Sequence, residues 1–187
     1  VAIFQESMGE TVCPGRIDQI LYPYYKKDRD AHLITRKRAK ELLESFCIKL
    51  CETIPVYSQA ITNLAGGMPS WQVVTMGGQD QEGNDTTNEL SYLLLEIATE
   101  LRMRQPNFHA RIHSGSPPEF RKAIYTALAE GSNTPALFND DVIIPAMTSV
   151  GYDIRDARDY VAIGCVEPTA PGKTLGSTDA AILNIPL

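Results

Sequence analysis

Two side chains near the end of the sequence have types and spacing suited to radical chemistry. Cys165 follows Gly164 at the end of an apolar stretch, and Glu167 stands two residues further on. Side chains at i and i+2 of an extended chain point the same way, so we expect the thiol and the carboxylate to share one pocket. A nearby carboxylate raises the pKa of a thiol and so disfavours thiolate chemistry. It does not hinder a neutral thiyl radical, which could take a hydrogen atom while the carboxylate takes a proton from a neighbouring hydroxyl.

Two further residues are candidates for contact with a substrate. Trp71 is the only tryptophan and stands at the start of an expected strand, where packing and a pocket wall are both open roles. His113 ends another expected strand, where it could touch a ligand or make a structural hydrogen bond. His109 lies four residues earlier on that strand, so the pair does not form a zinc-binding helix, and we predict no metal site.

Apolar patterning predicts the elements that must position these residues. Apolar residues recur every three or four positions in a helix that begins after Thr35 and ends before Pro55. Thr86 and Glu89 predict a capping box at the start of another helix. The other expected helices are residues 18–25, 118–131 and 140–150, and the expected strands are residues 2–5, 72–76, 108–112, 136–138 and 160–163.

Strands and helices therefore alternate along most of the chain. This order predicts an α/β fold with right-handed crossovers and a parallel sheet, either open or closed into a barrel. Functional sites in such folds gather at the carboxyl ends of the strands. We therefore expect the loops 77–85, 113–117, 139–141 and 164–178 to share one rim.

Composition excludes several classes of protein. The 187 residues carry 17 basic and 23 acidic side chains, a net charge of −6, which argues against general nucleic-acid binding. No apolar run approaches the ~20 residues of a membrane span. Four cysteines are too few for a secreted disulfide scaffold, so reduced thiols in a cytoplasm are expected. The sequence has no initiator methionine and stops in an apolar run, which predicts an internal fragment of a longer chain.

The motif Gly164-Cys-Val-Glu-Pro168 resembles the active-site loop of glycyl radical enzymes, in the dehydratase and lyase branch of the pyruvate formate-lyase-like proteins. Similar segments are found along essentially the whole chain, at residues 6–10, 14–25, 84–92, 105–106, 111–113, 135–140 and 157–160.

This resemblance implies the fold and the radical chemistry. Residues 1–187 would form about half of a catalytic α/β barrel, with a carboxyl-terminal glycyl radical domain absent from this chain, since no Arg-Val-x-Gly motif occurs in it. Cys165 would be the thiyl radical that takes hydrogen from substrate carbon, and Glu167 the base for the hydroxyl on that carbon. No cofactor is expected in this chain itself, and a radical S-adenosylmethionine activating enzyme would install the glycyl radical. A homodimer in the cytoplasm of an anaerobic bacterium is implied, with enclosure in a microcompartment left open.

The leaving group is a separate question. Residues 4–15 and 168–179 most resemble members that split isethionate (2-hydroxyethanesulfonate) into acetaldehyde and sulfite, in which a tryptophan at the position of Trp71 lines the pocket. Glycerol and propane-1,2-diol dehydratases share Gly-Cys-Val-Glu-Pro, so hydroxide stays an alternative. Arg16, Arg111 and Lys173 lie near the expected rim, but no cation can be assigned to a sulfonate.

Two interpretations of the sequence that belong to other functional classes also stay open. One is a conventional enzyme in which His113 helps Cys165 to act as a nucleophile. The other is a non-catalytic binding domain, in which Cys165 and Glu167 would be replaceable.

Overall fold

The computed structural model describes residues 11–52, 59–64, 71–132 and 134–174. The strand expected at residues 2–5 lies outside these ranges. Among the described helices, none is both long and apolar enough to cross a membrane.

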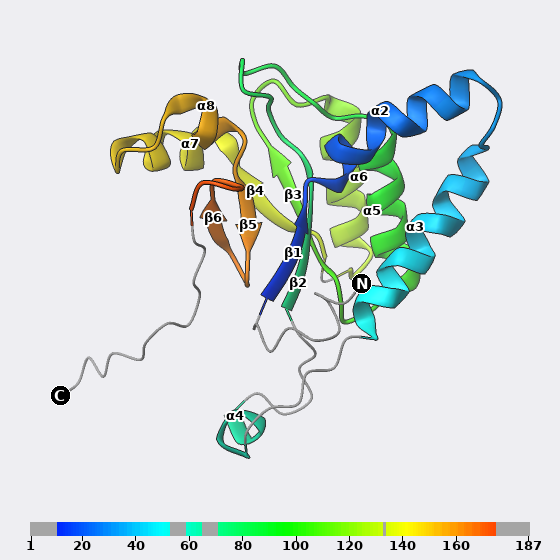
Figure 1. Ribbon diagram of the computed structural model, residues 1–187, viewed down its shortest axis with the longest axis horizontal. Coiled ribbons are helices and arrows are strands. Elements are labelled where there is room, and N and C mark those ends of the chain that lie inside the picture. The colour runs from blue at the N-terminus through cyan, green and yellow to red at the C-terminus, as the bar shows by residue number, and fades with distance from the viewer. Residues whose placement is uncertain (1–10, 53–58, 65–70, 133, 175–187) are drawn as a thin grey trace.

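A four-stranded parallel sheet forms the centre of the described chain (Figure 1). The second and third strands pair regularly, as do the third and fourth, with Val74 beside Phe108 and Ala110 beside Leu137. The register of the first two strands shifts between Val12 and Gly15. The strands follow one another in chain order as β1 (Thr11–Gly15), β2 (Trp71–Gly77), β3 (Asn107–Ile112) and β4 (Ala136–Asn139). The predicted alternation of parallel strands and helices is therefore confirmed.

Helices cover one face of this sheet (Figure 1). The long ones are α2 (Ile17–Asp30), α3 (Arg36–Cys51), α5 (Glu89–Leu101) and α6 (Pro118–Ala129). The short ones are α4 (Gln59–Leu64), α7 (Asp140–Ser149) and α8 (Ile154–Arg158), of which α4 and α8 were not predicted. Helices α7 and α8 lie apart from the four long ones, toward β4 and β5 (Figure 1). The main core joins the helices to the sheet through Leu43, Cys47, Val74, Met76, Leu93, Ile97, Phe120 and Ile124.

The capping box predicted for Thr86 and Glu89 is wrong. Asn88 is the N-cap of α5, and its side chain accepts from the N–H of Leu90 at 2.9 Å. Ser91 closes the box by accepting from the N–H of Asn88 at 3.1 Å. The Thr86 hydroxyl instead donates to the carbonyl of Gly78, and a cap must point its oxygen at the free N–H groups of the first turn.

The strand expected at residues 160–163 exists, but it is not part of the parallel sheet. It is β5 (Val161–Ile163), which pairs antiparallel with β6 (Glu167–Thr169), so that Ile163 lies opposite Glu167. A turn at residues 164–166, with Gly164 at φ 58°, reverses the chain between them. A short apolar run does not reveal whether its partner is parallel or antiparallel. The hairpin lies on the side of the sheet away from α3, α5 and α6 (Figure 1).

Candidate active site

The hairpin β5–β6 runs back along the sheet from its carboxyl end. At its start, Val161 lies beside Gly15, because a Cβ on that glycine would be 3.5 Å from the Val161 Cγ1. Nearer its tip, the backbone of Gly164 lies against the thiol of Cys13, two residues earlier on β1. The tip at residues 164–166 therefore points toward the amino ends of β1 and β2.

Cys165 and Glu167 come together at this tip. Cys165 is exposed, and Glu167 is partly buried. The Oε2 atom of Glu167 accepts from the N–H groups of Cys165 and Val166, each at 2.9 Å. The carboxylate of Glu167 is bonded to the backbone of Cys165 within a tight turn and not along an extended chain. That the thiol and the carboxylate share one pocket stays a prediction. Within the described part of the chain, the hydrogen bonds of Glu167 involve Oε2 and not Oε1.

The predicted common rim is right for three loops and wrong for the tip of the hairpin. Asp85 lies 3.0 Å from the ring of His113, and Asp141 accepts from the N–H of Ser114 at 2.7 Å, so these three loops meet. Residues 170–173 also reach this end, where Lys173 pairs with Asp156. Cys165 does not, because β5 carries it toward the opposite end of the sheet.

The two predicted substrate contacts lie at opposite ends of the sheet. His113 is buried at the carboxyl end, where Nε2 faces Asp85 and Nδ1 accepts from the N–H of Gly115 at 3.1 Å. The structure does not bring it to Cys165. Trp71 begins β2 beside Thr11, at the end toward which the hairpin points. Its side chain is outside what the structure describes, and a substrate role for either residue stays a prediction.

The three basic residues near the expected rim already face carboxylates. Arg111 is fully buried against Asp140, Arg16 pairs with Asp159 at 2.9 Å, and exposed Lys173 pairs with Asp156. None is a ready-made cation for a sulfonate.

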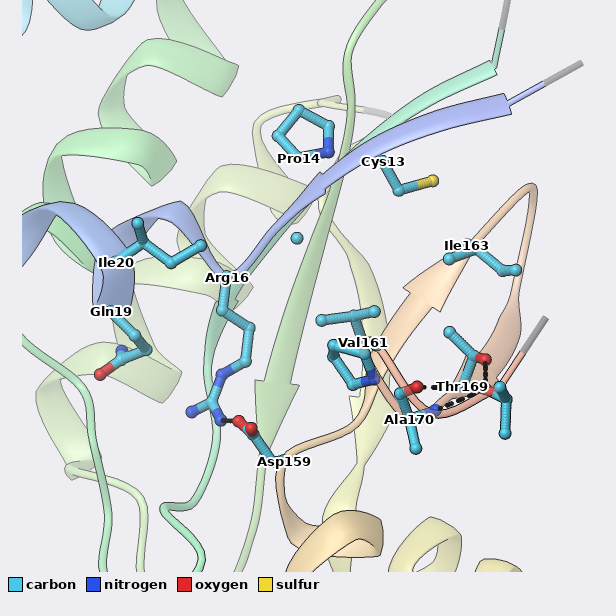
Figure 2. Close-up of a pocket in the computed structure, with 14 residues that line it drawn as sticks. Cys13, Pro14, Arg16, Gln19, Ile20, Asp159, Val161, Ile163, Thr169 and Ala170 are labelled. Atoms are coloured by element: carbon cyan, nitrogen blue, oxygen red, sulfur yellow. Dashed lines mark hydrogen bonds and ion pairs between the residues drawn. The ribbon is translucent and has the colours of Figure 1, made fainter. Parts of the chain in front are cut away.

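A pocket of about 430 Å³ lies between β1, the start of α2 and the hairpin (Figure 2). Cys13, Arg16 and Asp159 are among the residues that line it. Neither Cys165 nor Glu167 lines this pocket, so it is not the site of the chemistry predicted above.

Sequence reasoning missed a group of uncharged polar side chains close to the hairpin. Thr75 and His109 are register partners on β2 and β3, and both are buried. Within the described residues, the Thr75 hydroxyl and His109 Nδ1 have no hydrogen-bond partner. Burial lowers the pKa of His109 from 6.5 to about 4, against a smaller opposite effect of Glu167. Burial also raises the pKa of Cys13, which keeps this thiol neutral. A threonine inside an apolar strand was the available signal for this group.

His109 makes stability depend on pH. Because its folded pKa lies below 6.5, the unfolded chain binds more protons at acid pH, and stability is lost as the pH falls from 6.5 toward 4. One pKa unit corresponds to about 1.4 kcal/mol, so the loss reaches about 3 kcal/mol. We expect His109→Gln to flatten the free energy of unfolding between pH 7 and pH 4, as measured by urea denaturation. The exposed His32 supplies the control, because His32→Asn should keep the wild-type slope. An unchanged slope in His109→Gln would contradict the prediction.

A comparison with protein families supports the resemblance found in the motifs. The family model "Pyruvate formate lyase-like" matches residues 1–187, which is the whole chain. The chain belongs to this family.

Individual members of the pyruvate formate lyase-like family are similar over most of the chain. Isethionate sulfite-lyase of Desulfovibrio desulfuricans is 35% identical over 181 residues, which is 96% of this chain and 22% of the relative. The probable dehydratase YbiW of Escherichia coli is 40% identical over 172 residues, 90% of this chain and 21% of the relative. The solved glycerol-bound, B12-independent glycerol dehydratase from Clostridium butyricum is 44% identical, with a TM-score of 0.82, and the match covers 88% of this chain and 21% of that one.

These matches confirm the predicted fold class. The solved relatives are glycyl radical enzymes with an α/β barrel, and the parallel strands and helices described above form part of such a barrel. The chain spans about a fifth of the length of the family members it matches.

Proposed function

We propose that this chain supplies the hydrogen-abstracting thiol and the base of a glycyl radical lyase. The observation that carries the proposal is the hairpin tip, where Cys165 is exposed and the carboxylate of Glu167 is held beside it by two N–H groups. Residues 1–187 are then an internal part of a catalytic barrel domain, and the radical-bearing glycine belongs to a carboxyl-terminal domain outside this chain.

An exposed thiol at the end of a narrow hairpin fits a residue that receives a radical from another segment. A glycyl radical installed by a radical S-adenosylmethionine enzyme supplies the unpaired electron. No cofactor is held by this chain itself in the proposal. The longer protein is a homodimer in the cytoplasm of an anaerobic bacterium.

The residues of this chain then divide the reaction between them. The Cys165 thiyl takes a hydrogen atom from the carbon that bears the substrate hydroxyl, so a C–H bond breaks and an S–H bond forms. A hydroxyl beside a carbon radical is far more acidic than an ordinary alcohol, so the Glu167 carboxylate can remove its proton. The ketyl radical expels the group on the adjacent carbon, which leaves with its bonding electron pair. The product radical recovers a hydrogen atom from Cys165.

Isethionate is the proposed substrate, with acetaldehyde and sulfite as products. The proposal is supported by the 35% identity to isethionate sulfite-lyase and by Trp71 at the end of the sheet to which the hairpin points. Dehydration of glycerol or propane-1,2-diol is the second candidate, supported by the 44% identity to a glycerol dehydratase.

Product analysis of the activated, full-length protein decides between the two. Under anaerobic conditions, we expect sulfite and acetaldehyde to be released from isethionate, and both can be measured colorimetrically. Dehydration of glycerol or propane-1,2-diol without sulfite release would instead show that the protein is a dehydratase. Failure with all three substrates, in protein that carries the radical, would contradict both assignments.

A further inference from the structure

Two arginines hold the three residues that lead into the hairpin. These residues are Arg158, Asp159 and Tyr160, and the arginines are Arg111 on β3 and Arg16 just before α2. We call the two arginines and their acceptors on residues 158–160, together with Asp140, the arginine anchor.

Arg111 is the centre of the arginine anchor. Its Nε and Nη2 donate to the two carboxylate oxygens of Asp140 at 2.9 and 2.8 Å. The same guanidinium donates to the carbonyls of Tyr160 at 2.8 Å and Arg158 at 2.7 Å. Arg111, Asp140 and Tyr160 are all fully buried. Such a planar, multiply bonded guanidinium leaves its acceptors little freedom to move.

Tyr160 adds two contacts to this group. Its ring lies under the guanidinium, with 3.9 Å from the Arg111 Cζ to the ring centroid, and its hydroxyl donates to Asp140 at 2.9 Å. The backbone of Gly78, directly after β2, packs against the same guanidinium, since a Cβ there would lie 2.6 Å from the Arg111 Nε. The guanidinium is therefore enclosed by Gly78, α7 and residues 158–160.

Arg16 binds Asp159, the residue between Arg158 and Tyr160. Its Nη1 donates to Asp159 at 2.9 Å, and Figure 2 shows the two side chains meeting. Its Nη2 donates to the carbonyl of Gly77 at 3.1 Å and to the hydroxyl of Thr86 at 2.8 Å. Residues 158–160 are thus tied to both β1 and β3, at the carboxyl end of the sheet.

Cys165 follows this attachment closely along the chain. It lies five residues beyond Tyr160, in the turn that comes directly after the three residues of β5. The hairpin has only three residues in each strand, and an isolated two-stranded hairpin is marginally stable at best. Reacting atoms must approach to about 3–3.5 Å, and a displacement of about 1 Å can cost about a hundredfold in rate.

We propose that Arg111 and Arg16 are positioning residues that set where Cys165 meets the substrate carbon. This inference rests on the proposed function, because it assigns the arginine anchor a part in hydrogen abstraction and not in substrate binding.

The test compares Arg111→Lys, Arg16→Lys and Tyr160→Phe with the wild type in the activated, full-length protein. Arg155→Lys is the matched control, since Arg155 makes an exposed pair with Glu82 outside the arginine anchor. Turnover is normalised to the glycyl radical measured by electron paramagnetic resonance. The kinetic isotope effect is measured with deuterium on the hydroxyl-bearing carbon of the substrate.

For the two lysine variants we expect kcat per radical to fall about 10- to 100-fold, with KM little changed and a larger isotope effect. The kcat per radical of Tyr160→Phe should fall less than that of the lysine variants, and the kcat per radical of Arg155→Lys should match the wild type. A purely structural role would lower the amount of folded, radical-bearing protein but leave kcat per radical and the isotope effect unchanged, and that result overturns the proposal. If neither lysine variant folds, the kcat per radical and the isotope effect of Tyr160→Phe test the proposal in the same way. This variant is expected to fold, because it removes only one hydroxyl.

A second measurement separates this proposal from the proposed function. Hydrogen–deuterium exchange of residues 161–169 should speed up in the anchor variants and not in Arg155→Lys. If the wild type turns over neither isethionate nor a diol, the proposed function fails, while this exchange still tests the attachment of the hairpin. Unchanged exchange in folded anchor variants overturns the inference.

Discussion

Cys165→Ser is expected to stop turnover in the activated, full-length protein, by at least about a thousandfold, while the glycyl radical signal persists. A hydroxyl holds its hydrogen in a stronger bond than a thiol does, so a serine cannot accept the radical that a cysteine accepts. The change keeps the backbone N–H of residue 165, so the hydrogen bond from this N–H to Glu167 should remain. Turnover and electron paramagnetic resonance on the same sample provide the check.

Cys51→Ser is the matched control for this experiment. Cys51 is the last residue of α3 and has no part in the proposed reaction, so it should be replaceable with little loss of turnover. Turnover retained in Cys165→Ser would remove Cys165 from the mechanism.

Alkylation of Cys165 tests the alternative in which this residue is a conventional nucleophile. That alternative requires oxygen-tolerant activity and rapid alkylation of Cys165 near neutral pH. It also requires His113 beside Cys165, whereas His113 faces Asp85 at the other end of the sheet. We therefore expect slow alkylation of Cys165, and rapid alkylation that is lost in His113→Gln would contradict this expectation.

Glu167→Gln is expected to lower kcat per radical by about 10²- to 10⁴-fold, the usual range for loss of a general base. The glutamine carbonyl can still accept from the N–H groups of Cys165 and Val166, so the hairpin should keep its shape. What is lost is the ability of the second oxygen to take the hydroxyl proton. Steady-state turnover on the preferred substrate, normalised to radical content, measures the effect.

An exposed glutamate provides the control for this substitution. Glu130 follows α6, far along the chain from the hairpin, and Glu130→Gln should have wild-type turnover. A Glu167→Gln protein within about twofold of the wild type would show that another group takes the proton, or that no proton is taken before the leaving group departs.

Local patterning was enough to predict most of the elements. The helix from Arg36 to Cys51 and the strand from Asn107 to Ile112 repeat their apolar residues with the period of their own structure, so neighbouring residues specify them. The start of α5 was misplaced, because Thr86 and Asn88 are both good capping residues. Only the packing of Thr86 against Gly78 and Arg16 excludes it from that role.

The sequence by itself determined that Cys165 and Glu167 lie close to each other, because they are only two residues apart, but it did not reveal the turn that joins them. Tertiary structure alone decided the direction in which that turn points and what holds it. Arg111 reaches partners 29 and 49 residues away, at Asp140 and Tyr160, and such long-range pairs leave no periodic signal in the chain. These buried charges meet their partners only where the sheet, α7 and residues 158–160 come together, because a buried charge must be paired and hydrogen-bonded.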